Sequence, residues 1–113
     1  MSEALDPEVA AQGFAAVGSD SRLRVLRALV RAGRSGLNIS EIQQRTGIAA
    51  STLAHHLRFL NSGGLITQHK QGRSVLNRAD YARIEALAEF LTTECCVDEA
   101  DACCDLPQGD GDE

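Results

Sequence analysis

Apolar residues recur at helical spacing along most of the chain, and capping residues stand where each helix is expected to begin. Pro7 suits the first turn of a short helix that runs to about Val17. Ser19 or Asp20 then caps a second helix, which ends at Gly33. This second helix is predicted to be the first core helix, and its apolar positions are Leu23, Val25, Leu26, Leu29 and Val30.

The next two helices are short and are separated by a glycine. Asn38 is placed to cap the first of them, and Glu41 can return the hydrogen bond, so this helix runs to about Thr46. After Gly47, the segment AASTLAHHLRFLNSGGL carries one apolar stripe and ends at a pair of glycines. The stripe consists of Leu53, Leu57 and Leu60. Two short helices joined by a tight turn predict a helix-turn-helix.

Two extended segments follow, LITQHK and RSVLNR, and their alternating character around Gln71 and Gly72 predicts a β-hairpin. Asp80 then caps a last helix that is expected to reach the first pair of cysteines. Its apolar stripe is Ile84, Leu87, Ala88 and Leu91. This order of elements predicts a mainly α fold with a β-hairpin wing, a winged helix-turn-helix, over residues 1–94. A cysteine-rich acidic tail, residues 95–113, follows it.

The composition is that of one small domain. With 113 residues, 43% of them apolar, the chain can bury a single modest core. It has no apolar run of eighteen residues, and MSEALDPEVAAQGF has neither a basic leader nor an apolar signal core, so we expect a cytoplasmic protein without a membrane partner. We expect no enzyme, because no Ser-His-Asp arrangement, phosphate loop or Cys-x-x-Cys at a helix start is apparent.

The formal net charge of −5 hides two segments of opposite sign. No Asp or Glu occurs from Ile42 to Arg78, and from Glu94 to Glu113 there are eight acids but no Lys or Arg. The positive charges of the first segment are Arg45, Arg58, Lys70, Arg73 and Arg78. A surface that only needs to be soluble mixes both signs, so the acid-free segment indicates DNA as a partner.

The second helix of the helix-turn-helix is narrow enough for the major groove, and a hairpin beside it can reach the DNA backbone. The candidate DNA contacts lie opposite the leucine stripe and at the hairpin tip, and they are Ser51, Thr52, His55, Arg58, Lys70 and Arg73. Arg58 can contact either a guanine or a phosphate, and Lys70 and Arg73 also suit an ordinary solvated turn. His56 lies on the packing side, where a boundary histidine with satisfied hydrogen bonds is expected.

The segments SDSRLRVLRALV and NISEIQQRTGIAASTLAHHLRFLNSGGLITQHKQGRSVLNR, together with the closing helix, resemble the ArsR/SmtB family of metalloregulatory repressors over about residues 7–96. STLAHHLRFLNSGGLI is similar to the recognition-helix signature of that family. The resemblance implies a homodimer, built mainly from the first and last helices, on a palindromic double-stranded operator. It also implies release of this DNA when an inducer binds.

All four cysteines, Cys95, Cys96, Cys103 and Cys104, lie in the acidic tail. Structural disulfides are uncommon in a reducing compartment, so these thiols indicate metal binding or redox sensing, and four sulfurs without a histidine favour a soft ion. Adjacent side chains of a helix point about 100° apart, so Cys95 and Cys96 need a frayed helix end to share an ion. Trivalent arsenic or antimony takes three thiolates, whereas zinc or cadmium takes four more naturally.

The other inducer sites of the resembled family have no ligands in this chain, since SEIQQRTG contains no cysteine and residues 80–94 contain no histidine. The tail resembles the arsenite-responsive subgroup, which ends its last helix in a similar CC…C pattern. The resemblance implies As(III), and also Sb(III), as the inducer of an arsenic-resistance operon, held by Cys95, Cys96 and either Cys103 or Cys104. Sensing of cadmium, lead, zinc or redox state through the same thiols stays open. So do more remote roles as an arsenical carrier or a thiol oxidoreductase, and a tail without a role.

Overall fold

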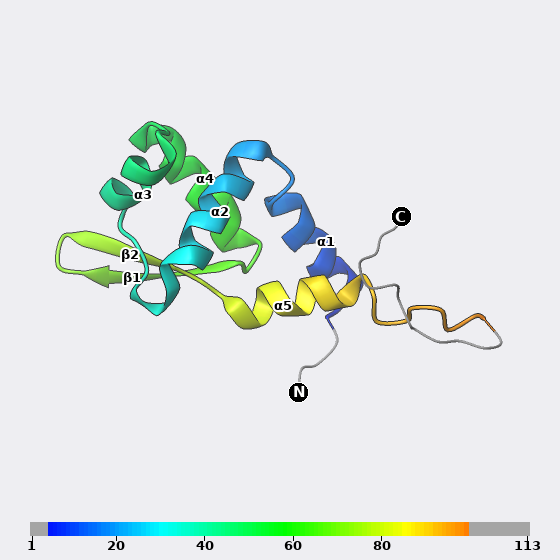
Figure 1. Ribbon diagram of the computed structural model, residues 1–113. Helices are drawn as coiled ribbons and strands as arrows, with labels where there is room; N and C mark the ends of the chain where they lie inside the picture. The colour runs from blue at the N-terminus through cyan, green and yellow to red at the C-terminus, as the bar shows by residue number, and fades with distance from the viewer. Residues whose placement is uncertain (1–4, 100–113) are drawn as a thin grey trace.

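The computed structural model describes residues 5–99 and contains five α-helices and one hairpin within that range (Figure 1). The elements in chain order are α1 (Pro7–Ala16), α2 (Asp20–Ala32), a short 3₁₀ turn η1 (Gly33–Ser35), α3 (Ile39–Thr46), α4 (Ala50–Ser62), β1 (Ile66–Gln71), β2 (Ser74–Ala79) and α5 (Tyr81–Phe90). The predicted mainly α fold with a hairpin wing is confirmed. None of the helices in the described range is long and apolar enough to cross a membrane.

The helices begin where short polar side chains can accept a hydrogen bond from the first turn. Ser19, rather than Asp20, caps α2, since its Oγ accepts a hydrogen bond from the backbone NH of Arg22 at 3.3 Å. Asn38 and Glu41 form the predicted capping box, with hydrogen bonds of 2.9 Å in both directions. Asp80 caps α5 in the same way. These helix starts depend on residues within one turn, which is why they follow from the sequence.

The core forms where α2 packs against α3, α4 and β2. The three leucines of the predicted α4 stripe are buried, together with Val25, Leu26 and Leu29 of α2. The prediction for α2 was wrong at two positions, because Leu23 and Val30 are 44% and 39% exposed. Both lie on one flank of the helix, about 100° round from Leu29. The buried face is therefore narrower than the apolar pattern indicates.

The hairpin pairs Ile66 with Ala79 and Gln71 with Ser74, and Gly72, with φ of 63°, lies in its turn. Asn77 attaches this wing to the helices. It is fully buried, its Nδ2 donates to the Leu37 carbonyl at 3.1 Å, and its Oδ1 accepts from Gln68 Nε2 at 2.8 Å. The backbones of Leu37 and Asn77 also exchange two hydrogen bonds of 2.9 Å. The wing is thus fixed relative to the start of α3.

The last helix is shorter than predicted, because α5 ends at Phe90 and does not reach the cysteines. The hydroxyls of Thr92 and Thr93 both donate to the carbonyl of Glu89, at 3.3 and 2.7 Å. Threonine hydroxyls that compete for backbone carbonyls disfavour helix continuation. Beyond them the chain follows successive turns with hydrogen bonds between residues three apart, as from Cys95 NH to the Thr92 carbonyl at 3.0 Å. Ala88 and Leu91, which the predicted stripe included, are exposed.

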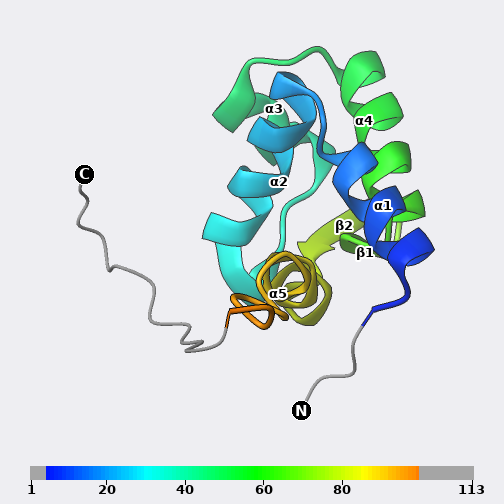
Figure 2. The same ribbon diagram turned by 90° about the vertical axis from the view of Figure 1, so that its right-hand side faces the viewer.

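The arrangement separates two ends of the molecule. Figure 1 shows α3, α4 and the hairpin at one end, and α1 and α5 at the other. Figure 2 looks along α5 and shows α2 and α3 on one side, with α1 and α4 on the opposite side. The division into residues 1–94 and 95–113 stays a prediction, because the described chain includes only residues 95–99 of the second part.

Candidate nucleic-acid interface and thiol site

One face of α4 carries all four side chains that the sequence assigns to DNA on this helix. Ser51, Thr52, His55 and Arg58 are exposed, while Leu53, Leu57 and Leu60 on the other face are fully or almost fully buried. Within residues 5–99, none of the four makes a side-chain hydrogen bond or an ion pair. Their donors and acceptors are therefore available to a ligand, and the guanidinium of Arg58 is suited to a phosphate or a guanine.

The hairpin supplies a second group of exposed polar residues. Lys70 pairs with Val75 near the end of the hairpin, and Arg73 lies in the turn between the strands. Both side chains are exposed. Figure 1 shows the hairpin tip extending beyond the helices at the same end of the molecule as α3. A wing in this place can reach a DNA backbone beside the groove that α4 enters.

His56 lies on the packing side of α4 and is half-buried. The expectation of a satisfied histidine was wrong for one atom, since the buried Nδ1 has no hydrogen-bond partner among the described residues. Burial lowers the pKa of His56 below its ordinary value of 6.5, and the positive charges of Arg22 and His55 lower the pKa further. The imidazole is therefore held toward its neutral form.

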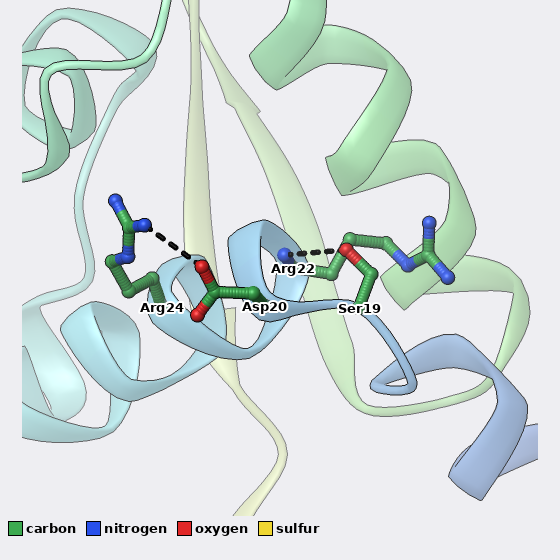
Figure 3. A network of polar contacts seen from close by, with 4 residues as sticks. All are labelled: Ser19, Asp20, Arg22 and Arg24. Atoms are coloured by element: carbon green, nitrogen blue, oxygen red, sulfur yellow. Dashed lines mark hydrogen bonds and ion pairs between the residues drawn. The ribbon is translucent and has the colours of Figure 1, made fainter.

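Arg22 is a residue that the sequence interpretation missed. Its Nε donates to the carbonyl of Ala16 at 2.6 Å, and its Nη2 donates to the carbonyl of Ala15 at 3.3 Å. Its guanidinium carbon lies 4.7 Å from the centre of the Phe59 ring on α4. That ring in turn meets the ring of His55 edge-on, with 5.0 Å between centroids. Figure 3 shows Arg22 extending toward α4, whereas Arg24 points to the opposite side of α2.

The outer face of α2 carries a further group of arginines, which line an open pocket of about 530 Å³ with the end of α3. The lining residues are Arg24, Arg27, Ala28, Arg31, Arg45 and Thr46. Arg24 makes an exposed ion pair of 3.0 Å with Asp20, and such pairs contribute little to stability. The spacing of residues 24, 27 and 31 on one helical face is visible in the sequence, but the prediction considered only the segment after residue 42.

The two described cysteines, Cys95 and Cys96, are half-buried, and their Sγ atoms lie 3.5 Å apart. Cys96 has φ of 60°, a left-handed conformation that non-glycine residues seldom adopt. Two thiolates on one tetrahedral zinc, each at ~2.3 Å, would lie about 3.8 Å apart, so these sulfurs already have the spacing of ligands to one ion. Because the helix has ended, adjacent side chains converge here.

Cys103 and Cys104, the other predicted ligands, lie outside the described residues. Within residues 5–99, no group of three or more His, Cys, Asp or Glu side chains is arranged to hold a metal ion. The described chain therefore presents two neighbouring thiols, and the assignment of Cys103 and Cys104 as ligands stays a prediction.

Comparison with known proteins finds helix-turn-helix and ArsR-family transcriptional regulators. A family model described as a helix-turn-helix domain matches residues 17–69. The uncharacterized HTH-type transcriptional regulator YceK of Bacillus subtilis (strain 168) is 30% identical over 69 residues, which are 61% of this chain and 68% of that protein. A crystal structure of an ArsR-family transcriptional regulator is 28% identical with a TM-score of 0.70, covering 87% of this chain and 98% of the other.

A solution structure of a homodimeric winged helix-turn-helix DNA-binding domain from Mycobacterium bovis, a possible ArsR-family regulator, is 26% identical. Its TM-score is 0.62, and the match covers 83% of this chain and 92% of that domain. The family model, over residues 17–69, includes the whole of α4 with its four candidate DNA contacts.

Proposed function

Because the chain belongs to the helix-turn-helix transcriptional regulators and its fold is similar to that of an ArsR-family regulator, we propose that it represses an arsenic-resistance operon. We propose further that it leaves its operator when trivalent arsenic binds the C-terminal thiolates. Regulators of this kind are not enzymes, and no residue is assigned a catalytic role. The single observation that carries the choice of inducer is the Cys95–Cys96 pair, whose sulfurs lie 3.5 Å apart where α5 has ended. Operator DNA as the target implies a cytoplasmic protein.

DNA binding in this proposal uses the exposed face of α4 in the major groove and the hairpin tip on the flanking backbone. Ser51, Thr52, His55 and Arg58 are exposed on one helix face, and Lys70 and Arg73 are exposed on the wing. One such domain covers only a half-site, so a homodimer on a palindromic operator doubles the phosphate contacts. The homodimeric relative from Mycobacterium bovis supports this assembly.

Trivalent arsenic suits the thiols because it is soft and takes three sulfur ligands. Cys95 and Cys96 supply two of them, and either Cys103 or Cys104 supplies the third. Trivalent antimony has the same ligand preference and is expected to act in the same way. The left-handed backbone of Cys96 costs on the order of 1–3 kcal/mol, and such strain is typical of ligand-binding positions. An ion that binds the convergent sulfurs makes use of a geometry that the folded chain already has.

The proposed inducer is tested by a gel-shift titration with DNA from upstream of the gene, with and without arsenite. Arsenite is expected to weaken operator binding by about 5- to 150-fold, the usual range for coupled sites. The double variant Cys95→Ser, Cys96→Ser should bind DNA as the wild type does but ignore arsenite. Full induction of that variant would contradict the proposal. Parallel lanes with antimonite, cadmium, lead, zinc and peroxide identify the inducer if arsenite has no effect.

The DNA-binding face is tested in the same assay with Arg58→Ala. Loss of this guanidinium is expected to weaken operator binding by about 5- to 150-fold, equivalent to ~1–3 kcal/mol. Arg27→Ala is the matched control, because it removes an exposed arginine from the pocket on the outer face of α2. Equal weakening by both changes would argue against the assignment of the α4 face.

A further inference from the structure

Helix α1 lies directly between α5 and α4, and two glycines permit the close contacts. A Cβ atom placed on Gly13 of α1 would lie 2.8 Å from Leu87 Cδ1 of α5. A Cβ atom placed on Gly63, at the end of α4, would lie 2.7 Å from the Cβ of Ala16 in α1. All four residues are buried. A change in the position of α5 therefore cannot leave α1 in place, and α1 in turn bears on α4.

Arg22 contacts both α1 and α4 through its guanidinium. Its guanidinium donates to the carbonyls of Ala15 and Ala16, the last two residues of α1, at 3.3 and 2.6 Å. A cation is favoured at this position, because the final carbonyls of a helix have no partner within it and carry partial negative charge. The same guanidinium lies 4.7 Å from the centre of the Phe59 ring, which supports a cation–π contact with α4.

Phe59 extends this connection to the face assigned to DNA. Its ring is 44% exposed and meets the ring of His55, one turn earlier on α4, at 5.0 Å. His55 is one of the candidate DNA contacts. The contacts therefore run from Leu87 of α5 to Gly13 of α1, and from the end of α1 through Arg22 and Phe59 to His55. Every step is a direct contact between described residues.

We propose that Arg22 is a positioning residue that transmits inducer binding from α5 to the recognition helix α4 by holding the end of α1 against Phe59. This inference rests on the proposed function, because it requires an ion bound at the thiols that follow α5. An ion bound at Cys95 and Cys96 changes the end of α5, and α1 moves with it through the contact between Leu87 and Gly13. Arg22 makes α4 respond to that movement. Without the guanidinium, the two helices still pack but are less strongly coupled.

The test measures operator affinity of the full-length dimer, with and without arsenite, and takes the ratio of the two dissociation constants as the response. Arg22→Met keeps an unbranched apolar side chain but loses the donors and the charge. We expect its operator affinity without arsenite to stay near that of the wild type. We also expect its arsenite affinity, measured on the free protein, to be little changed. The response should fall by about 2- to 30-fold, the range reported for residues along coupling networks.

Arg24→Met is the matched control, since it removes an arginine two positions away whose side chain points to the opposite side of α2 (Figure 3). Its response to arsenite should equal that of the wild type. Phe59→Leu is a second variant, which removes the ring and keeps an apolar side chain, and it should also reduce the response. If Arg22 and Phe59 act as one unit, combining the two changes should reduce the response no further than the more damaging single change does.

The possible outcomes separate this inference from the proposed function. A wild-type protein that ignores arsenite would overturn the proposed function and the inference with it. A responsive wild type with equally responsive Arg22→Met and Phe59→Leu variants would overturn the inference alone. A purely structural role of Arg22 predicts a lower melting temperature with an unchanged response. Circular dichroism of each variant separates that result from loss of coupling.

Discussion

At the scale of single residues, His56 links stability to pH. The folded protein lowers the pKa of its imidazole, mainly through burial and also through the charges of Arg22 and His55. The unfolded chain takes up a proton near the ordinary pKa of 6.5, whereas the folded protein resists protonation until a lower pH. Stability is therefore unaffected by His56 well above pH 6.5, and it decreases as the pH falls from about 6.5 to the lower pKa of the folded protein.

Urea denaturation at a series of pH values between 5 and 8 should show this dependence. The wild-type free energy of unfolding is expected to decrease as the pH falls below about 6.5. His56→Gln should flatten that decrease, because it removes the titrating group. Asn61→Gln, an exposed change in the same helix that removes no titrating group, should leave the decrease as it is in the wild type. A His56→Gln variant with an unchanged pH profile would show that other groups cause the dependence.

The exposure of some side chains could be predicted from the sequence, whereas the contacts of others could not. The exposed face of α4 follows from the 3.6-residue period, because burial of Leu53 and Leu57 places Ser51 and Arg58 on the other side. The contacts of Arg22 could not be predicted in this way. Its partners are the carbonyls of Ala15 and Ala16 and the ring of Phe59, 37 positions along the chain, so they become neighbours only in the fold.

At the scale of elements, helix starts were easier to predict than helix ends. The capping box of α3 involves Asn38 and Glu41, so the sequence pattern that predicts this helix start spans only four residues. The end of α5 depends on a competition between backbone hydrogen bonds and the hydroxyls of Thr92 and Thr93. The periodic pattern continues to Leu91 and contains no information about this competition. The width of the buried face of α2 was overestimated for a related reason. The sequence pattern shows which residues are apolar, but not how much of the helix surface α3, α4 and β2 cover.

The capping box of α3 makes a specific contribution to stability. Asn38→Ala removes the acceptor of the 2.9 Å hydrogen bond from the Glu41 backbone NH and should cost about 1 kcal/mol. For a domain of this size we expect the melting temperature to fall by about 4 °C. Ser40→Ala in the same helix changes an exposed side chain and is the control. Equal losses for the two variants in a calorimetric scan would contradict the assignment.

At the scale of the whole molecule, the exposed apolar residues of the described chain suggest an interface for the proposed homodimer. Leu91 is 70% exposed just after α5, and Val97 is 65% exposed six residues later. Both side chains belong to the segment that follows α5, and large exposed apolar side chains are candidates for an interaction site. This end is opposite the hairpin, so a dimer built there leaves both wings and both α4 faces accessible to DNA (Figure 1).

Leu91→Glu is therefore expected to weaken the homodimer. Burying a leucine side chain contributes ~1.5–3 kcal/mol, so the dimer dissociation constant should rise by at least about tenfold. Light scattering across a dilution series measures this change, and operator affinity should decrease with it. Leu23→Glu changes an exposed leucine on α2 instead and should leave the dimer intact. A Leu91→Glu protein that stays as dimeric as the wild type would place the interface elsewhere.

The charge distribution of the whole chain was only partly recognised from the sequence. Between residues 21 and 79 there is a single acid, Glu41, and it is engaged in the capping box of α3. Ten of the eleven Lys and Arg residues lie in that range, which extends well beyond the acid-free segment from Ile42 to Arg78. The thiol site stays a prediction, because two of its four candidate ligands, Cys103 and Cys104, lie outside the described residues.

The early end of α5 has an evolutionary consequence. Leu87 is the last buried residue of the described core, with Phe90 packed against that core, so the chain from Leu91 onward contributes little to it. Mutations in this segment can add, remove or exchange ligand residues at little cost in folding free energy. Under the proposed function, a lineage with this architecture can therefore acquire a response to a different ion while the DNA-binding end of the fold stays the same. The same separation would make the segment a practical place to engineer new ligand specificities.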